Sequence, residues 1–475
     1  MTNADVYGPA LSDASERSHR YLRDLRERRV LPSADDLALL DRLDGPVPET
    51  GSDPVEVLRM LDESGSPATM GTQGGRYFGF VVGGALPAAL AANWLAGAWN
   101  QNAGSFTVSP VGARLEEVAL RWIRELLGLP DTSEGAFVTG ATMANFTALA
   151  AARHAVLAAA GWDVEENGLA GAPPITVVVG EEVHVSMLKA ISMLGLGRGR
   201  VVRLPVDAQG RIRPDTLPRL TGPSIVCAQA GNVNSGAFDP VGAIAPRAKE
   251  AGAWVHVDGA FGLWASAAPS RRRLAEGVAL ADSWATDGHK WLNVPYDSGI
   301  VFVRNSADLR AAMSMGPAAY LAPSEHREPW NFTPELSRRA RGVEAWAALR
   351  SQGRSGVAAL VERTCQFATR FADGLRAAGY DVLNEVELNQ VLVAFGDDAT
   401  TGQVIARLQA DGTCWCGGTR WHGRAAMRIS VSSWATTADD VDRSLSAMLR
   451  IADEVRKGRP PSDGSREGAS PSGPR

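Results

Sequence analysis

The sequence has few cysteines, no excess of basic residues and no second metal-binding pair. Four cysteines in 475 residues do not make a disulfide framework. Cys414 and Cys416 form a C-W-C pair, but no further Cys/His pair lies at zinc-ligand spacing, so we expect buried structural thiols and no metal site. The net charge of −5 gives no reason to expect nucleic acid or an anionic membrane as partner.

Long uncharged apolar runs are also absent. No stretch approaches the roughly 18 to 20 apolar residues of a membrane-spanning helix. The nearest, FGFVVGGALPAALAANWLAGAW (78–99), is rich in Gly and Ala and contains a Pro, which favours a buried helix of a soluble protein. The N-terminus lacks both the basic start and the apolar core of a secretory signal. These absences predict a cytoplasmic protein.

The length predicts two or three domains. Helical periodicity around polar linkers indicates an N-terminal helical segment over 1–75, and a large domain should follow over 76–335. Residues 336–456 begin with a long helical stretch and continue as a smaller α+β domain, with strands near 389–395 and 426–432 and a helix near 437–456. The tail over 457–475 is rich in Pro, Gly, Ser and charge, which predicts disorder.

Short β-branched runs alternate with helical stretches in the large domain. That alternation predicts βα units and a mainly parallel sheet covered on both faces. The runs are ITVVVG (175–180), RVVRLPV (200–206), SIVCAQA (224–230), AWVHVD (253–258), DSWATD (282–287) and GIVFVR (299–304). Ligands of such sheets bind outside the carboxyl ends of the strands, so residues there are the candidates for function.

Four features fall at strand ends. AFVTG runs into TGATMAN, where Ala141 and Thr142 open a helix whose free N–H groups suit a phosphate. A plain helix start capped by Thr142 is the alternative. His184 in EEVHVSMLKA opens another helix; its flat ring could stack on a second ring or simply cap the helix.

The other two features carry charge. Asp258 ends the strand AWVHVD before small residues, where a buried carboxylate needs a cation or else caps the next turn. Lys290 stands in DGHKW between an apolar strand and a Trp, where desolvation makes a nucleophilic amine; a surface lysine is the alternative. A dinucleotide-binding fold and a P-loop enzyme are excluded, because neither glycine motif occurs.

The order of these features resembles the group II pyridoxal-5′-phosphate (PLP) decarboxylases of fold type I, which act on aromatic amino acids, glutamate, histidine and diaminobutyrate. The matching pieces run collinearly from about 75 to 450: RYFGF (76–80), SPVGARLEEVALRWIRELLGLP (109–130), TGATMAN (139–145), HVSMLKA (184–190), AGNVNSGAFDP (230–240), HVDGAFG (256–262) and DGHKW (287–291). The resemblance implies an α/β fold with a mostly parallel seven-stranded sheet, a small C-terminal α+β domain and an N-terminal helical segment.

The resemblance also implies roles for individual residues. Lys290 would hold PLP as a Schiff base, Asp258 would pair with the pyridinium nitrogen, and His184 would stack on the ring. The ring's other face would lie on Ala260, the phosphate on Ala141 and Thr142 with His289 nearby, and Asn232 near the phenolic oxygen or the substrate carboxylate. The family forms dimers with active sites at the interface, so the N-terminal helices should contact a second copy. Candidate substrate contacts are Phe80, Asn100, Trp330 and Arg428.

The sequence departs from the family at two places. Gly231-Asn232-Val233 stands where many relatives have Gly-Thr-Thr. The loop tyrosine that protonates the substrate carbon in many relatives is missing, since Arg327–Pro329 occupies that position and Tyr320 lies too far upstream. His326 could replace it as the acid.

Several reactions at the α-carbon therefore remain open. α-Decarboxylation leads. The alternatives are decarboxylation-dependent oxidative deamination or β-elimination at a C–S bond, as in natural-product pathways, and transamination, in which Arg428 would hold the α-carboxylate. A catalytically silent protein of the same fold would not need Lys290, Asp258 and His184 together.

Overall fold

The computed structural model describes residues 3–314 and 325–458. Its helices are α1 (Asn3–Asp24), α2 (Ala34–Ala38), α3 (Pro54–Gly65), α4 (Pro87–Trp99), α5 (Pro110–Leu127), α6 (Ala141–Ala158), α7 (Val164–Asn167), α8 (Val185–Met193), α9 (Val241–Glu250), α10 (Ser306–Met313), α11 (Gly342–Ala377), α12 (Asp398–Asp411) and α13 (Ala438–Arg456). Its strands are β1 (Glu134–Val138), β2 (Thr176–Gly180), β3 (Val202–Leu204), β4 (Ser224–Gln229), β5 (Trp254–Asp258), β6 (Ser283–Asp287), β7 (Gly299–Val303), β8 (Asp381–Val382), β9 (Gln390–Ala394), β10 (Gly417–Trp421) and β11 (Arg424–Ser430).

Strands β1 to β7 form one sheet in the order β1-β7-β6-β5-β4-β2-β3. The pairs from β3 to β6 are parallel, and β7 runs antiparallel to both β1 and β6. The mostly parallel seven-stranded sheet expected from the sequence is therefore confirmed, and the carboxyl ends of β4, β5 and β6 meet at one edge.

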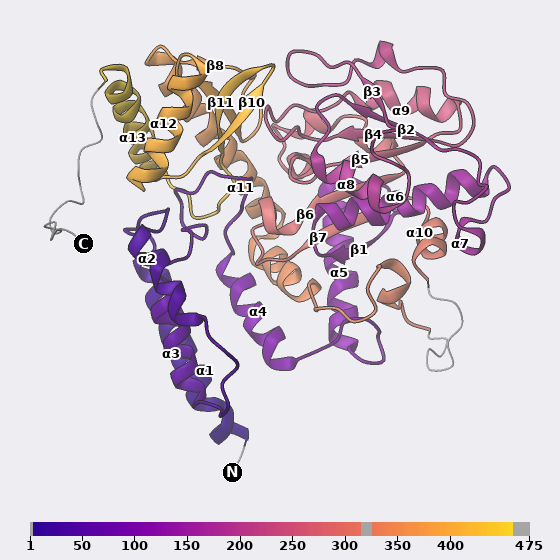
Figure 1. Cartoon of the computed structure of the whole chain (residues 1–475). Helices are drawn as coiled ribbons and strands as arrows, with labels where there is room; N and C mark the ends of the chain where they lie inside the picture. The colour runs from indigo at the N-terminus through magenta and orange to yellow at the C-terminus, as the bar shows by residue number, and fades with distance from the viewer. Residues whose placement is uncertain (1–2, 315–324, 459–475) are drawn as a thin grey trace, which may run out of the picture.

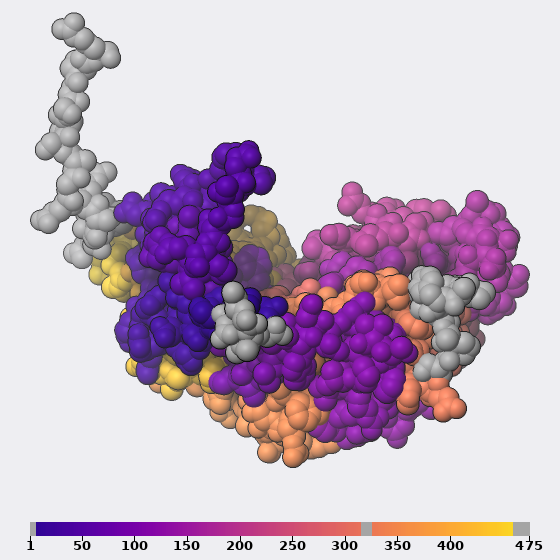
Figure 2. Space-filling model, turned by 90° about the horizontal axis from the view of Figure 1, so that it is seen from below, coloured from indigo at the N-terminus to yellow at the C-terminus, as the bar shows by residue number. Residues whose placement is uncertain are grey.

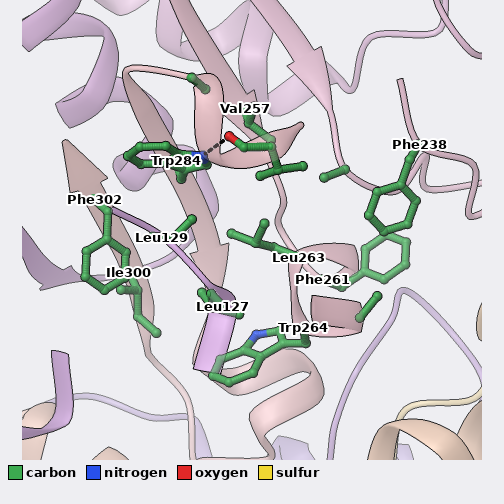
Figure 3. Packing of buried hydrophobic residues seen from close by; sticks show 14 of the residues in the cluster. Leu127, Leu129, Phe238, Val257, Phe261, Leu263, Trp264, Trp284, Ile300 and Phe302 are labelled. Carbon is green, nitrogen blue, oxygen red and sulfur yellow. Dashed lines mark hydrogen bonds between the residues drawn. The ribbon is translucent and has the colours of Figure 1, made fainter. Parts of the chain in front are cut away.

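Helices cover both faces of this sheet. Alternate side chains of each strand point to opposite sides, so the strands contribute to two buried cores. In β7, Ile300 and Phe302 pack with α5 and α9, whereas Val301 and Val303 pack with α6, α8 and α10. Figure 3 shows the first of these cores, where Trp284 donates its indole N–H to the carbonyl of Val278 at 2.9 Å. The two cores fix the strand ends that carry the candidate residues.

The C-terminal region has its own four-stranded antiparallel sheet in the order β10-β11-β9-β8, packed against α12, α13 and part of α11. The sequence predicted β9, β11 and α13 but not β8, α12 or β10. The long helix α11 begins at Gly342 rather than at the start of the predicted region 336–456, and it kinks at Gly353. Figure 1 shows this region beside the edge of the large sheet.

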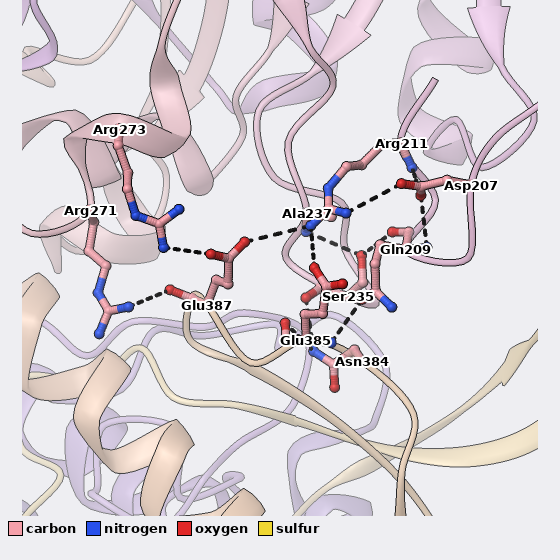
Figure 4. Close-up of polar contacts among 10 residues, drawn as sticks. All are labelled: Asp207, Gln209, Arg211, Ser235, Ala237, Arg271, Arg273, Asn384, Glu385 and Glu387. Atoms are coloured by element: carbon pink, nitrogen blue, oxygen red, sulfur yellow. Dashed lines mark hydrogen bonds and ion pairs between the residues drawn. The ribbon is translucent and has the colours of Figure 1, made fainter. Parts of the chain in front are cut away.

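Polar contacts join the two sheets' domains (Figure 4). Arg211 pairs with Glu385 at 2.6 Å, and Asn384 donates to the carbonyl of Ser235 at 2.9 Å. Arg273 pairs with Glu387 at 2.5 Å. Since Ser235 belongs to the loop after β4, these contacts hold that loop against the small domain.

The helix that covers much of residues 78–99 differs from its sequence prediction. In this single chain α4 buries Ala89 and Ala92, but Trp94, Leu95 and Trp99 are 44%, 54% and 43% exposed. The prediction that this helix is buried is therefore wrong for the single chain. The helices α1 and α3 pack together and extend away from the body beside α4, as Figures 1 and 2 show.

The described part of the chain contains no helix long and apolar enough to cross a membrane. Cys414 and Cys416 are buried free thiols, and no group of His, Cys, Asp and Glu among the described residues could hold a metal ion. Tyr320 and the tail from residue 459 lie outside the described residues, and the domain boundaries at 75, 335 and 456 stay predictions.

Candidate active site

Lys290 follows β6 on a single π-helical turn, Gly288–Leu292. Such turns are rare and frequent at functional sites. The ammonium Nζ lies 2.9 Å from Oδ2 of Asp287, the last residue of β6, and the side chains are 19% and 2% exposed. Oδ1 of Asp287 has no hydrogen-bond partner among the described residues. Lys290 thus lies in contact with an acidic side chain at a largely buried strand end and is not a surface lysine.

Two other parts of the chain close around this turn. A Cβ on Gly83 would lie 1.8 Å from the carbonyl oxygen of Lys290, so only glycine permits the approach. The Asn293 side chain accepts from the backbone N–H of Gly84 and of Trp434, each at 2.8 Å, and donates to the carbonyl of Ser432 at 3.0 Å. One asparagine therefore joins the lysine turn to the segment before α4 and to the small domain.

Asp258 ends β5, the strand next to β6. It is 5% exposed. Its Oδ1 accepts from the N–H of Ala260 at 3.1 Å, as the capping alternative predicted. Its Oδ2 accepts from Nδ2 of Asn145 at 3.0 Å, a contact that capping does not explain. Neither bond supplies a positive charge to this buried carboxylate.

His184 follows β2 and is the N-cap of α8. Its Nδ1 caps α8, 3.3 Å from the N–H and 2.7 Å from the Oγ of Ser186. Burial lowers the pKa of His184, the Asp258 carboxylate opposes that shift, and the Lys290 ammonium adds to it. The ring is therefore neutral near pH 7, and because Nδ1 accepts from the Ser186 N–H, its proton is on Nε2.

The N-terminus of α6 is open to an anion. Its N-cap is Gly140, which has no side chain for a capping bond, so Ala141 and Thr142 are the first two helical residues. The alternative in which Thr142 caps the helix is therefore wrong. Uncapped N–H groups of an 18-residue helix carry a partial positive charge.

His289 lies beside this helix start. A Cβ on Gly140 would be 3.4 Å from its Cε1. Its Nδ1 accepts from the N–H of Ser298 at 3.0 Å, and its ring stacks on Tyr296 at 4.3 Å. Burial lowers the pKa of His289, so the ring is held neutral.

Arg428, on β11, brings the small domain to the same place. It acts electrostatically on His184 and on Tyr77, and burial lowers its pKa. Its Nη1 donates to the carbonyl of Val233 at 3.3 Å. No carboxylate among the described residues forms an ion pair with it.

Asn232 is buried, but its polar atoms serve the loop after β4. Its Oδ1 accepts from the N–H of Asn234 at 2.8 Å and of Ser235 at 3.2 Å, and its Nδ2 donates to the carbonyl of Glu182 at 3.4 Å. The structure thus gives Asn232 a clear role in shaping this loop.

The remaining predicted substrate residues lie on separate segments. Phe80 is 64% exposed and stacks on Trp415 at 5.4 Å. Asn100 ends α4 in a left-handed conformation. The N–H of Trp330 donates to the carbonyl of Gly104 at 3.0 Å, and His326 stacks on Phe106 at 3.7 Å. Of these residues, Phe80 alone stands on the segment that wraps Lys290.

Sequence reasoning passed over three polar residues that the structure brings to the site. Asp287 touches Lys290, Asn145 touches Asp258, and Tyr296 stacks on His289. The first two lie inside the motifs DGHKW and TGATMAN, and an acidic residue three positions before Lys290 was a signal for an ion pair.

These groups fit PLP. The Lys290 amine matches its aldehyde. The Asp258 carboxylate, which has no ion pair in the part of the chain that the structure describes, matches its pyridine nitrogen, and the uncapped start of α6 matches its phosphate. The flat ring would need a flat neighbour, and the partly buried His184 at the start of α8 is a candidate for it.

Comparisons with known proteins agree. The model of the pyridoxal-dependent decarboxylase conserved domain matches residues 73–396. Aromatic-L-amino-acid decarboxylase of Bacillus atrophaeus is 27% identical over 92% of this chain and 93% of its own length, and L-2,4-diaminobutyrate decarboxylase of Rhizobium meliloti is 30% identical over 88% and 86%. A crystal structure of Oryza sativa TDC with PLP and tryptamine shares the fold, with a TM-score of 0.89, 24% identity and coverage of 95% and 98%.

These relatives support α-decarboxylation and do not favour oxidative deamination, β-elimination or transamination. The chain belongs to the pyridoxal-dependent decarboxylase family and is a PLP-dependent amino-acid decarboxylase.

Proposed function

We propose that Lys290 Nζ is the attachment point of PLP and that Asp258, His184 and the start of α6 hold its ring and phosphate. The observation that carries this proposal is the arrangement of neighbouring strand ends: the Lys290 amine follows β6, and the buried Asp258 carboxylate ends the adjacent β5. When bound, PLP supplies an electron sink for the bond that breaks at the α-carbon.

The chain's own residues prepare this chemistry. The Asp258 carboxylate is buried and forms no ion pair within residues 3–314 and 325–458, so it would hold a proton on the pyridine nitrogen. The carboxylate of Asp287 would orient the amine of Lys290. His289, neutral beside Gly140, would contribute with Ala141 and Thr142 to the phosphate site, and Ala260 would leave room for the ring.

The test is chemical labelling of the holoenzyme. Borohydride should fix the cofactor to the peptide that contains Lys290. Lys189 serves as the internal control, because it lies on α8 beyond His184 but has no acidic neighbour in an ion pair among the described residues. Labelling of any lysine other than Lys290 would refute the assignment.

For the substrate, we propose that Arg428 binds a carboxylate of the amino acid. Arg428 is partly buried, and its guanidinium has one carbonyl acceptor among the described residues, so it has unused donors for such a group. Phe80, Asn100 and Trp330 stay candidates for further contacts. A screen of amino acids for CO2 release would identify the substrate.

The matched pair of variants is Arg428→Ala and Arg424→Ala. Both arginines lie on β11, but Arg424 is half exposed and pairs with Asp381. Arg428→Ala should raise KM about 10-fold or more, by analogy with the loss of a charged hydrogen bond, and Arg424→Ala should leave it unchanged. Equal KM values in both variants would remove Arg428 from the substrate site.

We further propose a homodimer in which a second copy covers the exposed apolar faces of α1, α3 and α4. These faces carry Val6, Tyr7, Leu11, Val57, Met60, Leu61, Trp94, Leu95 and Trp99, all at least 43% exposed in one chain. A surface of this kind marks an interaction site. Leu95→Glu should shift the sedimentation of the enzyme toward the monomer, whereas Arg114→Glu, a change at an exposed position of α5, should not.

We also propose a cytoplasmic location and a role in secondary-metabolite biosynthesis. The changed residues around Asn232 and in the loop before Arg338 support that role. Expression with neighbouring biosynthetic genes would test that role.

A further inference from the structure

A chain of polar side chains runs through the core behind Asp258. Asn145 on α6 links Asp258 to His256, whose Nε2 lies 2.9 Å from Oδ1 of Asn145. On its other side, Nδ1 of His256 lies 2.8 Å from Oγ of Ser283, which also accepts from the indole N–H of Trp254 at 2.8 Å. Asn145, His256 and Ser283 are fully buried.

This chain of hydrogen bonds can run in one direction only. An ionised carboxylate at Asp258 accepts but cannot donate, so the NH2 group of Asn145 faces it and the amide oxygen faces His256. That oxygen needs a proton on Nε2 of His256. In a neutral ring Nδ1 then accepts, and the hydroxyl of Ser283 must donate to it.

The far end imposes the same direction. An indole N–H only donates, so Ser283 Oγ must accept from Trp254 and is left with its own proton to give to His256. Burial lowers the pKa of His256 to about 3, which keeps the ring neutral. The proton positions set by Asp258 and those set by Trp254 therefore agree without an unpaired group.

Burying the polar side chains of Asn145, His256 and Ser283 in an apolar core costs free energy, so a function that offsets this cost is expected. Apolar residues of similar size would fill this space, and the hydrogen bond that the chain delivers ends on one oxygen of Asp258. We propose that Asn145, His256 and Ser283 are positioning residues that fix the orientation of the Asp258 carboxylate and hold a hydrogen bond on one of its oxygens. The inference rests on the proposed role of Asp258 toward the cofactor.

Three variants test it on the holoenzyme. Asn145→Ala removes the donor that touches Asp258. Ser283→Ala removes a hydroxyl that is separated from Asp258 by two other members of the hydrogen-bond network, His256 and Asn145, so any effect on Asp258 must pass through them. Thr147→Val is the matched control, since Thr147 is equally buried on α6 but its hydroxyl donates to the carbonyl of Met143 in its own helix.

Two readouts other than stability decide the outcome. We expect Asn145→Ala to lower kcat about 10- to 100-fold, as for loss of a hydrogen bond to a charged group, with little change in KM. We expect the visible absorption of the bound cofactor, followed against pH, to shift in Asn145→Ala and by less in Ser283→Ala. Thr147→Val should retain the wild-type spectrum and kcat.

A measurement on the wild-type enzyme guards against variants that fail to fold. With 15N-labelled histidine, the resonances of His256, assigned by their loss in His256→Gln, should show a proton on Nε2 alone and no titration between about pH 5 and 8, the range in which an ordinary histidine titrates. A proton on Nδ1, or titration in that range, would overturn the inference.

The outcomes separate this inference from the function on which it rests. If Asp258→Asn alters the cofactor spectrum but Asn145→Ala and Ser283→Ala do not, the positioning chain is refuted and the function stands. If Asp258→Asn leaves the spectrum and kcat at wild-type values, the proposed role of Asp258 is refuted, and with it the function proposed for the hydrogen-bond network.

Discussion

Exchanging the residues at positions 258 and 145 should separate two effects of Asp258, its contribution to stability through hydrogen bonds and its contribution to kcat through its charge. In Asp258→Asn, the new amide must meet two donors, the N–H of Ala260 and the NH2 of Asn145. Its single oxygen can accept from one of them, and its own NH2 then faces the other. If the Asn145 amide flips, its oxygen faces position 258, but its NH2 group then faces the N–H of His256, so two donors still oppose each other.

Asp258→Asn leaves one buried hydrogen-bond donor unpaired, which should lower the free energy of unfolding by about 1–3 kcal/mol. For a chain of this length that corresponds to a fall in Tm of about 1–3 °C. Loss of the carboxylate beside the pyridine nitrogen should lower kcat about 100-fold or more, the scale of removing one preorganised electrostatic group.

The double variant Asp258→Asn/Asn145→Asp restores every pairing. The amide now at position 258 would donate to the new carboxylate on α6 and accept from the N–H of Ala260, and that carboxylate would also accept from His256. We therefore expect Tm to return to the wild-type value while kcat stays about 100-fold low, because the charge now sits on α6.

The assay is thermal unfolding together with CO2 release on the substrate found by screening. Asp239→Asn is the control: its carboxylate also accepts two backbone N–H groups, from Ile212 at 2.7 Å and Gln229 at 2.6 Å, so its Tm should fall with kcat intact. Recovery of kcat in the double variant, or a Tm that stays at the Asp258→Asn value, would refute the reasoning.

Four further outcomes are expected. Lys290→Ala should abolish turnover with an unchanged circular dichroism spectrum, since only an amine can attach the cofactor; measurable turnover would contradict this. The pKa of His256 is about 3 in the folded protein and 6.5 in the unfolded chain, so the unfolded chain binds more protons between these values; acidification through that window should lower the free energy of unfolding by up to about 1.4 kcal/mol per pH unit, and urea unfolding of His256→Gln should show a smaller slope. Removal of residues 459–475 should leave kcat and Tm unchanged, because this stretch has almost no apolar side chains; a fall in either would show that it docks. Product analysis should give amine and CO2 in equal amounts without oxygen uptake, and an aldehyde or a thiol product would reopen the alternatives set aside by the comparisons.

The features predicted correctly from sequence were those that a local pattern encodes. The β-branched runs became β2 to β7 because a strand buried on both faces must be apolar throughout, and a short run of that kind has few other stable conformations. Asp258 and Lys290 were found as charges placed at the ends of such runs. The fold, the cofactor and the class of reaction therefore followed from the sequence and its resemblance to a family.

The tertiary structure decided what depends on neighbours distant in the chain. Asn145 is 113 residues from Asp258, and no local pattern tells an amide that serves a carboxylate from one that serves its own helix. Whether the Ala- and Trp-rich face of α4 is buried depends on what packs against it, so its composition alone gave the wrong answer for one chain. His184 caps α8 and also stands among four charged groups, a combination that only the meeting of β5, β6 and the small domain creates, because electrostatic interactions depend on distance in space and not along the sequence.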